Sequence, residues 1–272
     1  EISRIDSEKG DDIQITIDLR IQQYALTLLN EHKAGSVVLI DINTGNILCM
    51  ASTPSYNPNK IIQKPNRDYW NSILENDLSP LTYRCIQGLY APGSTFKMIV
   101  AIAGLIHGVI DTNTTHFCEG KIGLGDRLYH CWKNNGHGSM NVKNAIKESC
   151  DVYFYEISKK IGIDKIAKVA EDFGLGQIYD LPLSNQKKGI IPSKEWKKSN
   201  YDESWYPGET LISAIGQGFV LTNPLQLAIM TSIIASDGKN IKPNIIKKNK
   251  TTQFPKLEKY QEAINIIKHS MF

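Results

Sequence analysis

The feature that most constrains the fold is a run of nine apolar residues, Met98–Ile106, just after a Ser-x-x-Lys motif at Ser94 and Lys97. The pattern predicts a helix from Ser94 to Ile106 that is apolar on nearly every side, and such a helix lies in the interior of a protein. The run is far shorter than the roughly 20 residues of a membrane span. The rest of the chain must therefore fold around this helix, and Lys97 in its first turn has little access to water.

Strand patterns precede this helix. Ile13–Ile17 alternates apolar and polar residues, which predicts a strand with one buried face. Asp18 then provides an N-cap for a helix to about residue 31, with a buried face made of Ile21, Ala25, Leu28 and Leu29. Two apolar runs follow, Ser36–Ile42 and Asn46–Ser52, joined by the turn sequence Asn43-Thr44-Gly45. Because both runs are apolar on both faces, we expect a hairpin in a central antiparallel sheet with both faces covered.

Helical patterns dominate the rest of the chain. They predict helices at about 68–75, 142–161 with a break near residue 149, 164–173, 224–235 and 257–269. The segments 55–67, 112–140 and 180–209 lack a clear period and are expected to be irregular. Strands first and helices afterwards predict an α+β fold.

Composition excludes several classes of protein. The 272 residues are 41% apolar and 22% charged, which is typical of a globular domain and not of a disordered or low-complexity chain. A net charge of +3 is too small to indicate nucleic-acid binding. Asp and Lys crowd the first twelve residues, so no signal peptide is predicted there. Because the chain begins with Glu1, we expect it to be part of a longer protein.

The Ser-x-x-Lys pattern occurs three times, and its context separates the three. The pairs Ser184/Lys187 and Ser236/Lys239 lie in polar or helix-end sequence and are expected at the surface. Ser94 follows a Pro-Gly turn at the positive end of the buried helix, where a developing oxyanion is favoured. Lys97 projects from the same face, and burial favours its neutral form, which makes it a base for the serine. The alternative is a capping serine followed by a lysine that extends to solvent.

Seven stretches of the sequence resemble one family. They are Thr16–Gln23, Gly35–Pro54, Tyr83–Lys97, Ser149–Tyr155, Gly208–Thr210, Ile215–Gly218 and Thr222–Gln226. Together they make the chain similar, from about residue 11 to its end, to the penicillin-binding transpeptidases. Many relatives carry Asn at the last position of the second motif. This chain carries Asp151 there, and in this it resembles the elongation-specific branch of the family. The resemblance implies the fold shared with serine β-lactamases, with a helical subdomain at 94–175 and a linker at 1–11.

The resemblance also implies roles for four residues. Ser94 is the expected nucleophile and Lys97 the base that takes its proton. Ser149 is expected to relay a proton between Lys97 and the leaving group, while Asp151 binds Lys97 or the substrate amide. A helix cap is the alternative for Asp151.

The third motif of the family, Lys-(Thr/Ser)-Gly, is not in this sequence. Lys187-Lys188-Gly189 has the wrong middle residue and lies too early. That motif binds the substrate carboxylate, and its strand supplies one oxyanion donor. We therefore expect a partial transpeptidase domain that lacks its last strands and final helix, with reduced or absent activity of its own.

The function implied for the parent protein is peptidoglycan D,D-transpeptidation on D-Ala-D-Ala stem peptides, inhibited by β-lactams. The implied partner is a membrane glycosyltransferase. The implied location is the periplasmic face of the inner membrane, with an anchoring span outside this sequence. The alternatives are an oxacillinase-type β-lactamase, a non-catalytic penicillin-recognising sensor and a degenerate scaffold.

Cys118, Cys131, His137 and Cys150 are the candidate ligands of a structural zinc ion. Their spacings of 12, 5 and 12 residues are not a zinc-finger signature. However, the segment between them lacks an apolar period and needs an organiser, and Cys150 should face away from the active site if Ser149 and Asp151 face it. A Cys118–Cys131 disulfide and isolated buried thiols are the alternatives. Spare candidates are His116, His130 and Asp126, while Cys49 and Cys85 have no partner by spacing.

Overall fold

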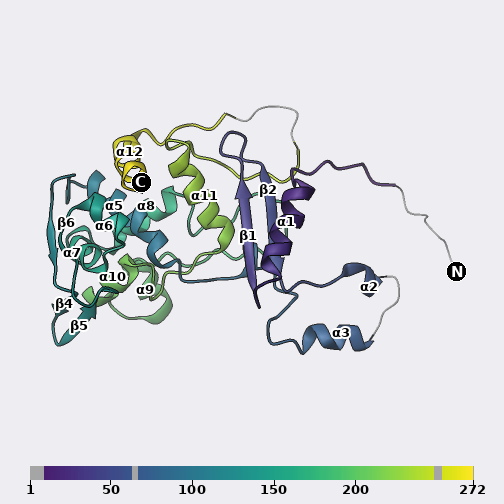
Figure 1. Cartoon of the computed structure of the whole chain (residues 1–272), viewed down its shortest axis with the longest axis horizontal. Helices are drawn as coiled ribbons and strands as arrows, with labels where there is room; N and C mark the ends of the chain where they lie inside the picture. Colours follow the sequence, from purple (N-terminus) through teal and green to yellow (C-terminus); the bar gives the residue numbers. More distant parts are fainter. Residues whose placement is uncertain (1–8, 63–66, 248–252, 272) are drawn as a thin grey trace.

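The computed structural model describes residues 9–62, 67–247 and 253–271, and it has an α+β fold (Figure 1). Its hairpin consists of β1 (Gly35–Ile40) and β2 (Ile47–Thr53), paired antiparallel. Helix α1 (Leu19–Leu29) packs on one face of the hairpin, whereas α4 (Arg84–Gln87) and α11 (Pro224–Ala235) pack on the other (Figure 1). The predicted hairpin with two covered faces is therefore confirmed.

Alternation along β2 explains this covering. Cys49 and Ala51 pack against Ala25 and Leu29 of α1, whereas Met50 between them belongs to the main core. A strand that is apolar on both faces thus joins two clusters.

The N-terminal prediction is only partly right. Asp18 caps α1 by accepting hydrogen bonds from the backbone N–H groups of Arg20 and Ile21. However, Ile13–Ile17 forms a single bridge, from Ile15 to Ile246, and Ile13 and Ile15 are 68% and 53% exposed. The expected buried face therefore fails at Ile13 and Ile15, whereas Ile17 packs against the main core. Leu28 on α1 is exposed as well.

The central helix is α5 (Lys97–Ile106), which follows a 3-10 turn at Gly93–Phe96. Every residue from Ile99 to Gly104 is buried. The helices that pack against α5 are α6 (Val142–Lys147), α7 (Asp151–Ile161), α8 (Ile163–Asp172) and α12 (Gln261–Ser270), the last of which follows a 3-10 turn at Glu258–Tyr260. The central position predicted for this helix is confirmed.

Two segments expected to be irregular contain regular structure. Residues 112–140 form two short antiparallel pairs, β3 (His116–Cys118) with β6 (Gly138–Met140), and β4 (Lys121–Leu124) with β5 (Arg127–His130). Strands of three or four residues are too short to show a period. Residues 180–209 contain α9 (Lys194–Tyr201) and the start of α10 (Pro207–Ala214).

The remaining helices are α2 (Pro58–Ile62), inside a segment expected to be a loop, and α3 (Arg67–Leu74), as predicted. The predicted break between α6 and α7 is confirmed at Ser149, which has a φ of +52°. Within the described residues, no helix is long and apolar enough to cross a membrane.

Candidate active site and adjoining candidate metal site

Ser94 stands exposed at the turn that leads into α5. The turn is fixed from outside, because the Gly93 N–H donates to the Gly216 carbonyl at 2.9 Å. Gly216 has a φ of +70°, and a Cβ there would lie 2.2 Å from the Gly93 carbonyl oxygen. Only glycine therefore allows the two segments to meet this closely.

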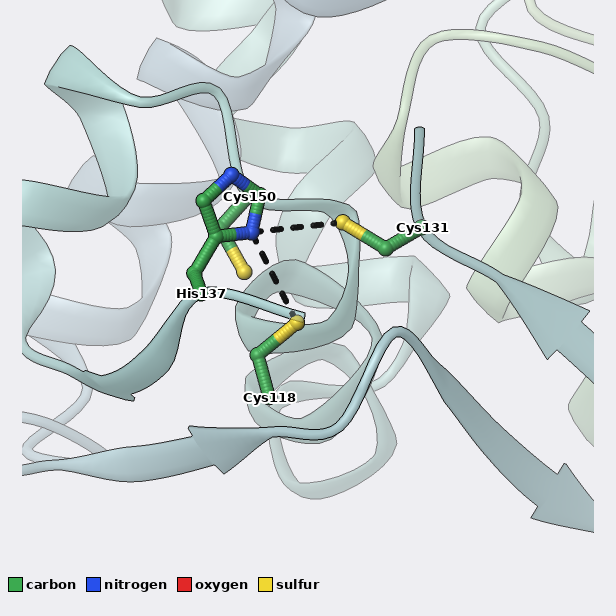
Figure 2. A group of neighbouring side chains, drawn as sticks. All are labelled: Cys118, Cys131, His137 and Cys150. Carbon is green, nitrogen blue, oxygen red and sulfur yellow. Dashed lines mark hydrogen bonds between the residues drawn. The ribbon is translucent and has the colours of Figure 1, made fainter. Parts of the chain in front are cut away.

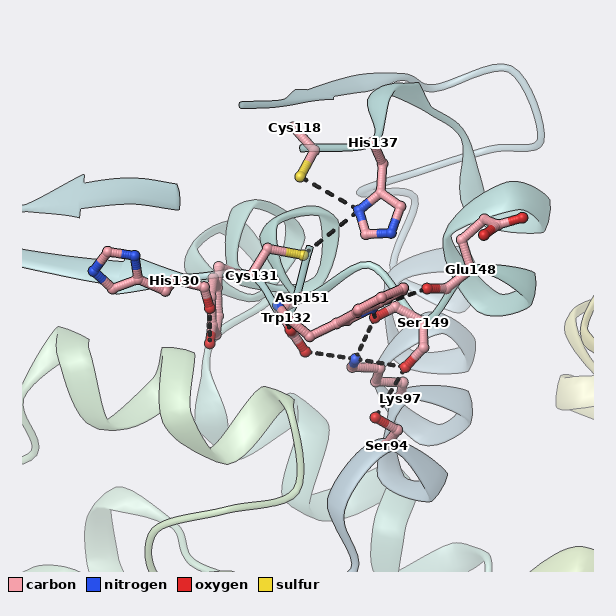
Figure 3. A network of polar contacts seen from close by, with 11 residues as sticks. Ser94, Lys97, Cys118, His130, Cys131, Trp132, His137, Glu148, Ser149 and Asp151 are labelled. Atoms are coloured by element: carbon pink, nitrogen blue, oxygen red, sulfur yellow. Dashed lines mark hydrogen bonds and ion pairs between the residues drawn. The ribbon is translucent and has the colours of Figure 1, made fainter. Parts of the chain in front are cut away.

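Lys97, three residues after Ser94, is only 2% exposed. Its Nζ donates to Ser149 Oγ at 3.0 Å, to the Ser149 carbonyl at 2.9 Å and to Asp151 Oδ1 at 2.6 Å. Ser149 Oγ in turn donates to Ser94 Oγ at 2.9 Å. Figure 3 shows this chain of contacts, in which Ser149 stands between the exposed serine and the buried lysine.

Lys97 Nζ and Asp151 Oδ1 form an ion pair at 2.6 Å that is largely closed to water. Asp151 is itself nearly buried, and its second oxygen accepts a hydrogen bond from the Trp132 backbone N–H at 2.9 Å. The carboxylate is therefore held in place beside the Lys97 amine.

Trp132 is the contact residue that sequence reasoning missed. Its indole Nε1 donates to the carbonyls of Glu148 and Ser149, both at 3.1 Å. The only signal in the sequence was its place directly after Cys131, because an aromatic residue in an irregular segment predicts no particular contact.

The structure thus brings Ser94, Lys97, Ser149 and Asp151 together, as the sequence predicted. The two other Ser-x-x-Lys pairs lie elsewhere. Ser184 is exposed as expected, but Ser236 is buried, contrary to the prediction, because its hydroxyl donates to the Ile233 carbonyl at the end of α11.

Cys118, Cys131, His137 and Cys150 also converge, as predicted (Figure 2). Their ligand atoms all lie within 4.8 Å of one another, and the three thiols are buried. His137 Nδ1 is 3.6 Å from Cys118 Sγ and 3.5 Å from Cys131 Sγ. A tetrahedral zinc ion with ordinary bond lengths separates such S and N atoms by about 3.6 Å.

The chemistry of these four groups fits a metal ion. Burial lowers the pKa of His137, and nearby Lys133 adds to this, so the ring is neutral and able to bind a cation. Burial raises the pKa of the Cys150 thiol, so a thiolate there needs a positive partner. All five cysteines are free, so the Cys118–Cys131 disulfide is not formed. His116, His130 and Asp126 lie outside the cluster.

An exposed serine at the start of a buried helix, joined through a second serine to a lysine three residues on, defines a class: the serine acyltransferases with a Ser-x-x-Lys motif. The family description "Penicillin binding protein transpeptidase domain" matches residues 35–272. The chain belongs to this family.

Similar proteins agree with this assignment. Peptidoglycan D,D-transpeptidase MrdA of Escherichia coli K12 is 36% identical over 240 residues, which is 88% of this chain. This chain spans only 38% of that relative's length.

Two solved structures are similar throughout. A chain in the complex between penicillin-binding protein 2 and MreC from Helicobacter pylori matches with a TM-score of 0.90 at 33% identity, covering 95% of this chain and 49% of that one. A chain from a study of polymerization and crosslinking by a peptidoglycan synthase complex matches with a TM-score of 0.85 at 31% identity, covering 96% and 49%. The predicted fold and family are therefore confirmed.

Proposed function

We propose that this chain is part of the transpeptidase domain of a peptidoglycan D,D-transpeptidase, with Ser94 as nucleophile. The observation that carries the proposal is the unbroken contact from Lys97 Nζ through Ser149 Oγ to Ser94 Oγ. Such a path activates a serine and returns the proton to a leaving group without solvent. The kinship with MrdA supports a stem peptide that ends in D-Ala-D-Ala as substrate.

In the first half-reaction, Ser94 Oγ attacks the penultimate D-Ala carbonyl. The Ser94 proton passes through Ser149 Oγ to the neutral amine of Lys97, and the Asp151 carboxylate at 2.6 Å stabilises the ammonium that forms. The C–N bond to the terminal D-Ala then breaks, and the relay delivers the proton to the departing amine. Ser94 is left as an ester of the stem peptide.

In the second half-reaction, an amine of a neighbouring stem peptide attacks this ester. The amine loses a proton to the relay, the C–O bond to Ser94 breaks and the Ser94 hydroxyl recovers its proton. The products are a cross-linked peptide and the free serine. A penicillin enters the first half-reaction in the same way, through opening of its four-membered ring.

The Ser94 backbone N–H faces the growing charge at the start of the helical turn and supplies one oxyanion donor. In the family, the Lys-(Thr/Ser)-Gly strand supplies the second donor and binds the substrate carboxylate. Loss of one oxyanion donor costs about 10²–10³ in rate. We therefore propose slow acylation by this chain and full activity only together with that motif.

We further propose that the Cys118–Cys131–His137–Cys150 cluster binds a structural zinc ion. A Cys₃His donor set is common in closed structural zinc sites, and the spacings described above match tetrahedral geometry. The ion would tie the loops that carry Trp132 and Asp151 to one point. Protein purified without chelator should contain one zinc per chain, and protein that contains no stoichiometric metal would overturn this assignment.

For the parent protein we propose the periplasmic face of the inner membrane as location and a membrane glycosyltransferase as partner. The match to a chain of a peptidoglycan synthase complex supports a partner that polymerises glycan. Co-purification of the parent protein with such a polymerase tests this.

The test of the activity measures two products in parallel: D-Ala released from a pentapeptide that ends in D-Ala-D-Ala, and penicillin that is hydrolysed. The proposal predicts a long-lived acyl-enzyme on Ser94 and less than about one penicillin turned over per minute. Rapid penicillin turnover would favour the β-lactamase. A stable acyl-enzyme in a parent protein that forms no cross-links would favour the sensor.

A further inference from the structure

Trp132 contacts both Ser149 and Asp151 of the second motif, although it lies outside that motif and outside the Ser-x-x-Lys motif. Its backbone N–H holds Asp151 Oδ2 at 2.9 Å, and its indole N–H is shared between the carbonyls of Glu148 and Ser149 at 3.1 Å. These contacts come from the loop after β5 and end on the turn between α6 and α7 (Figure 3). We infer that Trp132 is a positioning residue that fixes Ser149 and Asp151 for proton transfer, an inference that rests on the proposed acylation.

The turn that Trp132 holds needs an external support. Ser149 has a φ of +52°, in the left-handed region, which residues other than glycine rarely adopt. Its carbonyl accepts from both Trp132 Nε1 and Lys97 Nζ. The indole therefore helps to hold the carbonyl that also anchors the lysine, and Ser149 Oγ stays between Lys97 and Ser94.

The position of the side chain argues against a core role. Trp132 is 62% exposed, so little of its ring contributes to burial. Instead, the indole and the His137 ring pack in an edge-to-face arrangement, with ring centroids 5.3 Å apart and an interplanar angle of 68°. Trp132 thus lies between two sites. Its neighbour Cys131 belongs to the candidate metal site, and its indole contacts the turn that carries Ser149.

The first test needs no acylation. Hydrogen exchange of the indole N–H groups is followed by NMR, with Trp70 on α3 as reference because it is less exposed, at 40%, and its indole makes no hydrogen bond within the described chain. The Trp132 indole N–H should exchange at least tenfold more slowly than that of Trp70. Equal or faster exchange would refute the indole contact and with it the inference.

The second test compares Trp132→Phe with the matched change Trp70→Phe. Trp132→Phe keeps the ring and the backbone N–H but removes the indole donor. We expect its first-order penicillin acylation constant to fall about tenfold, with the dissociation constant of the non-covalent complex within twofold of the parent value, and its zinc content unchanged. Trp70→Phe should leave all three unchanged.

Other results would overturn the inference. An unchanged acylation constant excludes a positioning role, and a weaker complex with an unchanged acylation constant indicates a ligand contact. A fall that merely follows the folded fraction indicates a structural role. If the unmodified chain forms no acyl-enzyme, slow acylation by this chain is refuted, and the proposed function is then tested on a form of the protein that includes the Lys-(Thr/Ser)-Gly motif. The inference is then decided by proton exchange at Lys97 Nζ, which Trp132→Phe should accelerate and Trp70→Phe should not.

Discussion

Ser149 combines a chemical task with an unfavourable backbone conformation. Its hydroxyl links Lys97 to Ser94, and its φ of +52° lies where a side chain is disfavoured. Glycine would adopt this φ without strain but has no hydroxyl to transfer a proton. In the proposed mechanism, the strain is thus a local cost of placing a hydroxyl between Lys97 and Ser94.

Two substitutions at Ser149 separate chemistry from strain. Ser149→Ala and Ser149→Gly both remove the hydroxyl, so both should lower the penicillin acylation rate by about 10²–10⁴. Only glycine relieves the backbone, so Ser149→Gly should be about 1 kcal/mol more stable than Ser149→Ala. Stopped-flow acylation and urea unfolding measure the two effects. Acylation of Ser149→Ala at the parent rate would exclude the relay.

At this scale the sequence predicted Ser94, Lys97, Ser149 and Asp151 but not the residue that supports them. Ser94 and Lys97 could be found because they open an apolar helix and because the residues around them resemble a known family. Trp132 could not be found, because its role depends on a backbone N–H and on a turn that closes 17 residues later.

Among the helices, Asp172 at the end of α8 joins α8 to the segment that leads into α12. Burial by itself would raise the pKa of Asp172, but hydrogen bonds from Lys168, Lys259 and Tyr260 outweigh burial and hold the pKa at about 2. Because α8 and α12 both pack against α5, this contact helps to enclose the helix that carries Lys97.

Asp172→Asn should therefore destabilise the protein in a pH-dependent way. A pKa lowered from 3.8 to about 2 in the folded state corresponds to about 2 kcal/mol at pH 7. This contribution is complete above the unfolded-state pKa, falls to roughly half by pH 3 and is lost as the pH falls through about 2. Urea unfolding of both proteins between pH 7 and pH 3 measures the difference. A gap that stays constant over this range would contradict the assignment.

The elements differ in how far sequence predicts them. Helix α8, which has a clear apolar face, and helix α11, which is apolar nearly all round, were predicted within one residue. Strands β3 to β6 were not predicted, because three or four residues are too few to show a period and their pairing is set by partners distant in sequence. Alternation at Ile13–Ile17 predicted a strand with a buried face, but the segment forms one bridge and only Ile17 packs against the core.

For the whole molecule, two kinds of organisation meet at the active site. A large apolar core encloses α5 and fixes Lys97 from one side. Trp132, after β5, and Asp151, the first residue of α7, meet beside this lysine. Their neighbours Cys131 and Cys150 belong to the cluster of three cysteines and His137. The sequence named these four residues, but only the fold shows that their ligand atoms meet.

Metal removal should loosen this second part before the first. A structural zinc site saturated about 1,000-fold above its Kd contributes about 4 kcal/mol, so a strong chelator should lower Tm by about 10 °C. Alkylation should then accelerate at Cys118, Cys131 and Cys150, while Cys49 and Cys85 in the sheet core stay protected until global unfolding. Mass spectrometry of alkylated peptides provides the readout. Equal protection of all five thiols with and without chelator would rule the metal out.

The most direct test of the central claim is the intact mass of the protein after incubation with benzylpenicillin. The account predicts a single covalent adduct on the unmodified chain and on Ser184→Ala, which changes another Ser-x-x-Lys pair. It predicts no adduct on Ser94→Ala. Peptide mapping should place the adduct on Ser94. An adduct that persists in Ser94→Ala would contradict the account. If the unmodified chain forms no adduct, the same measurement is made on a form of the protein that includes the Lys-(Thr/Ser)-Gly motif. No adduct on that form would refute Ser94 as the nucleophile.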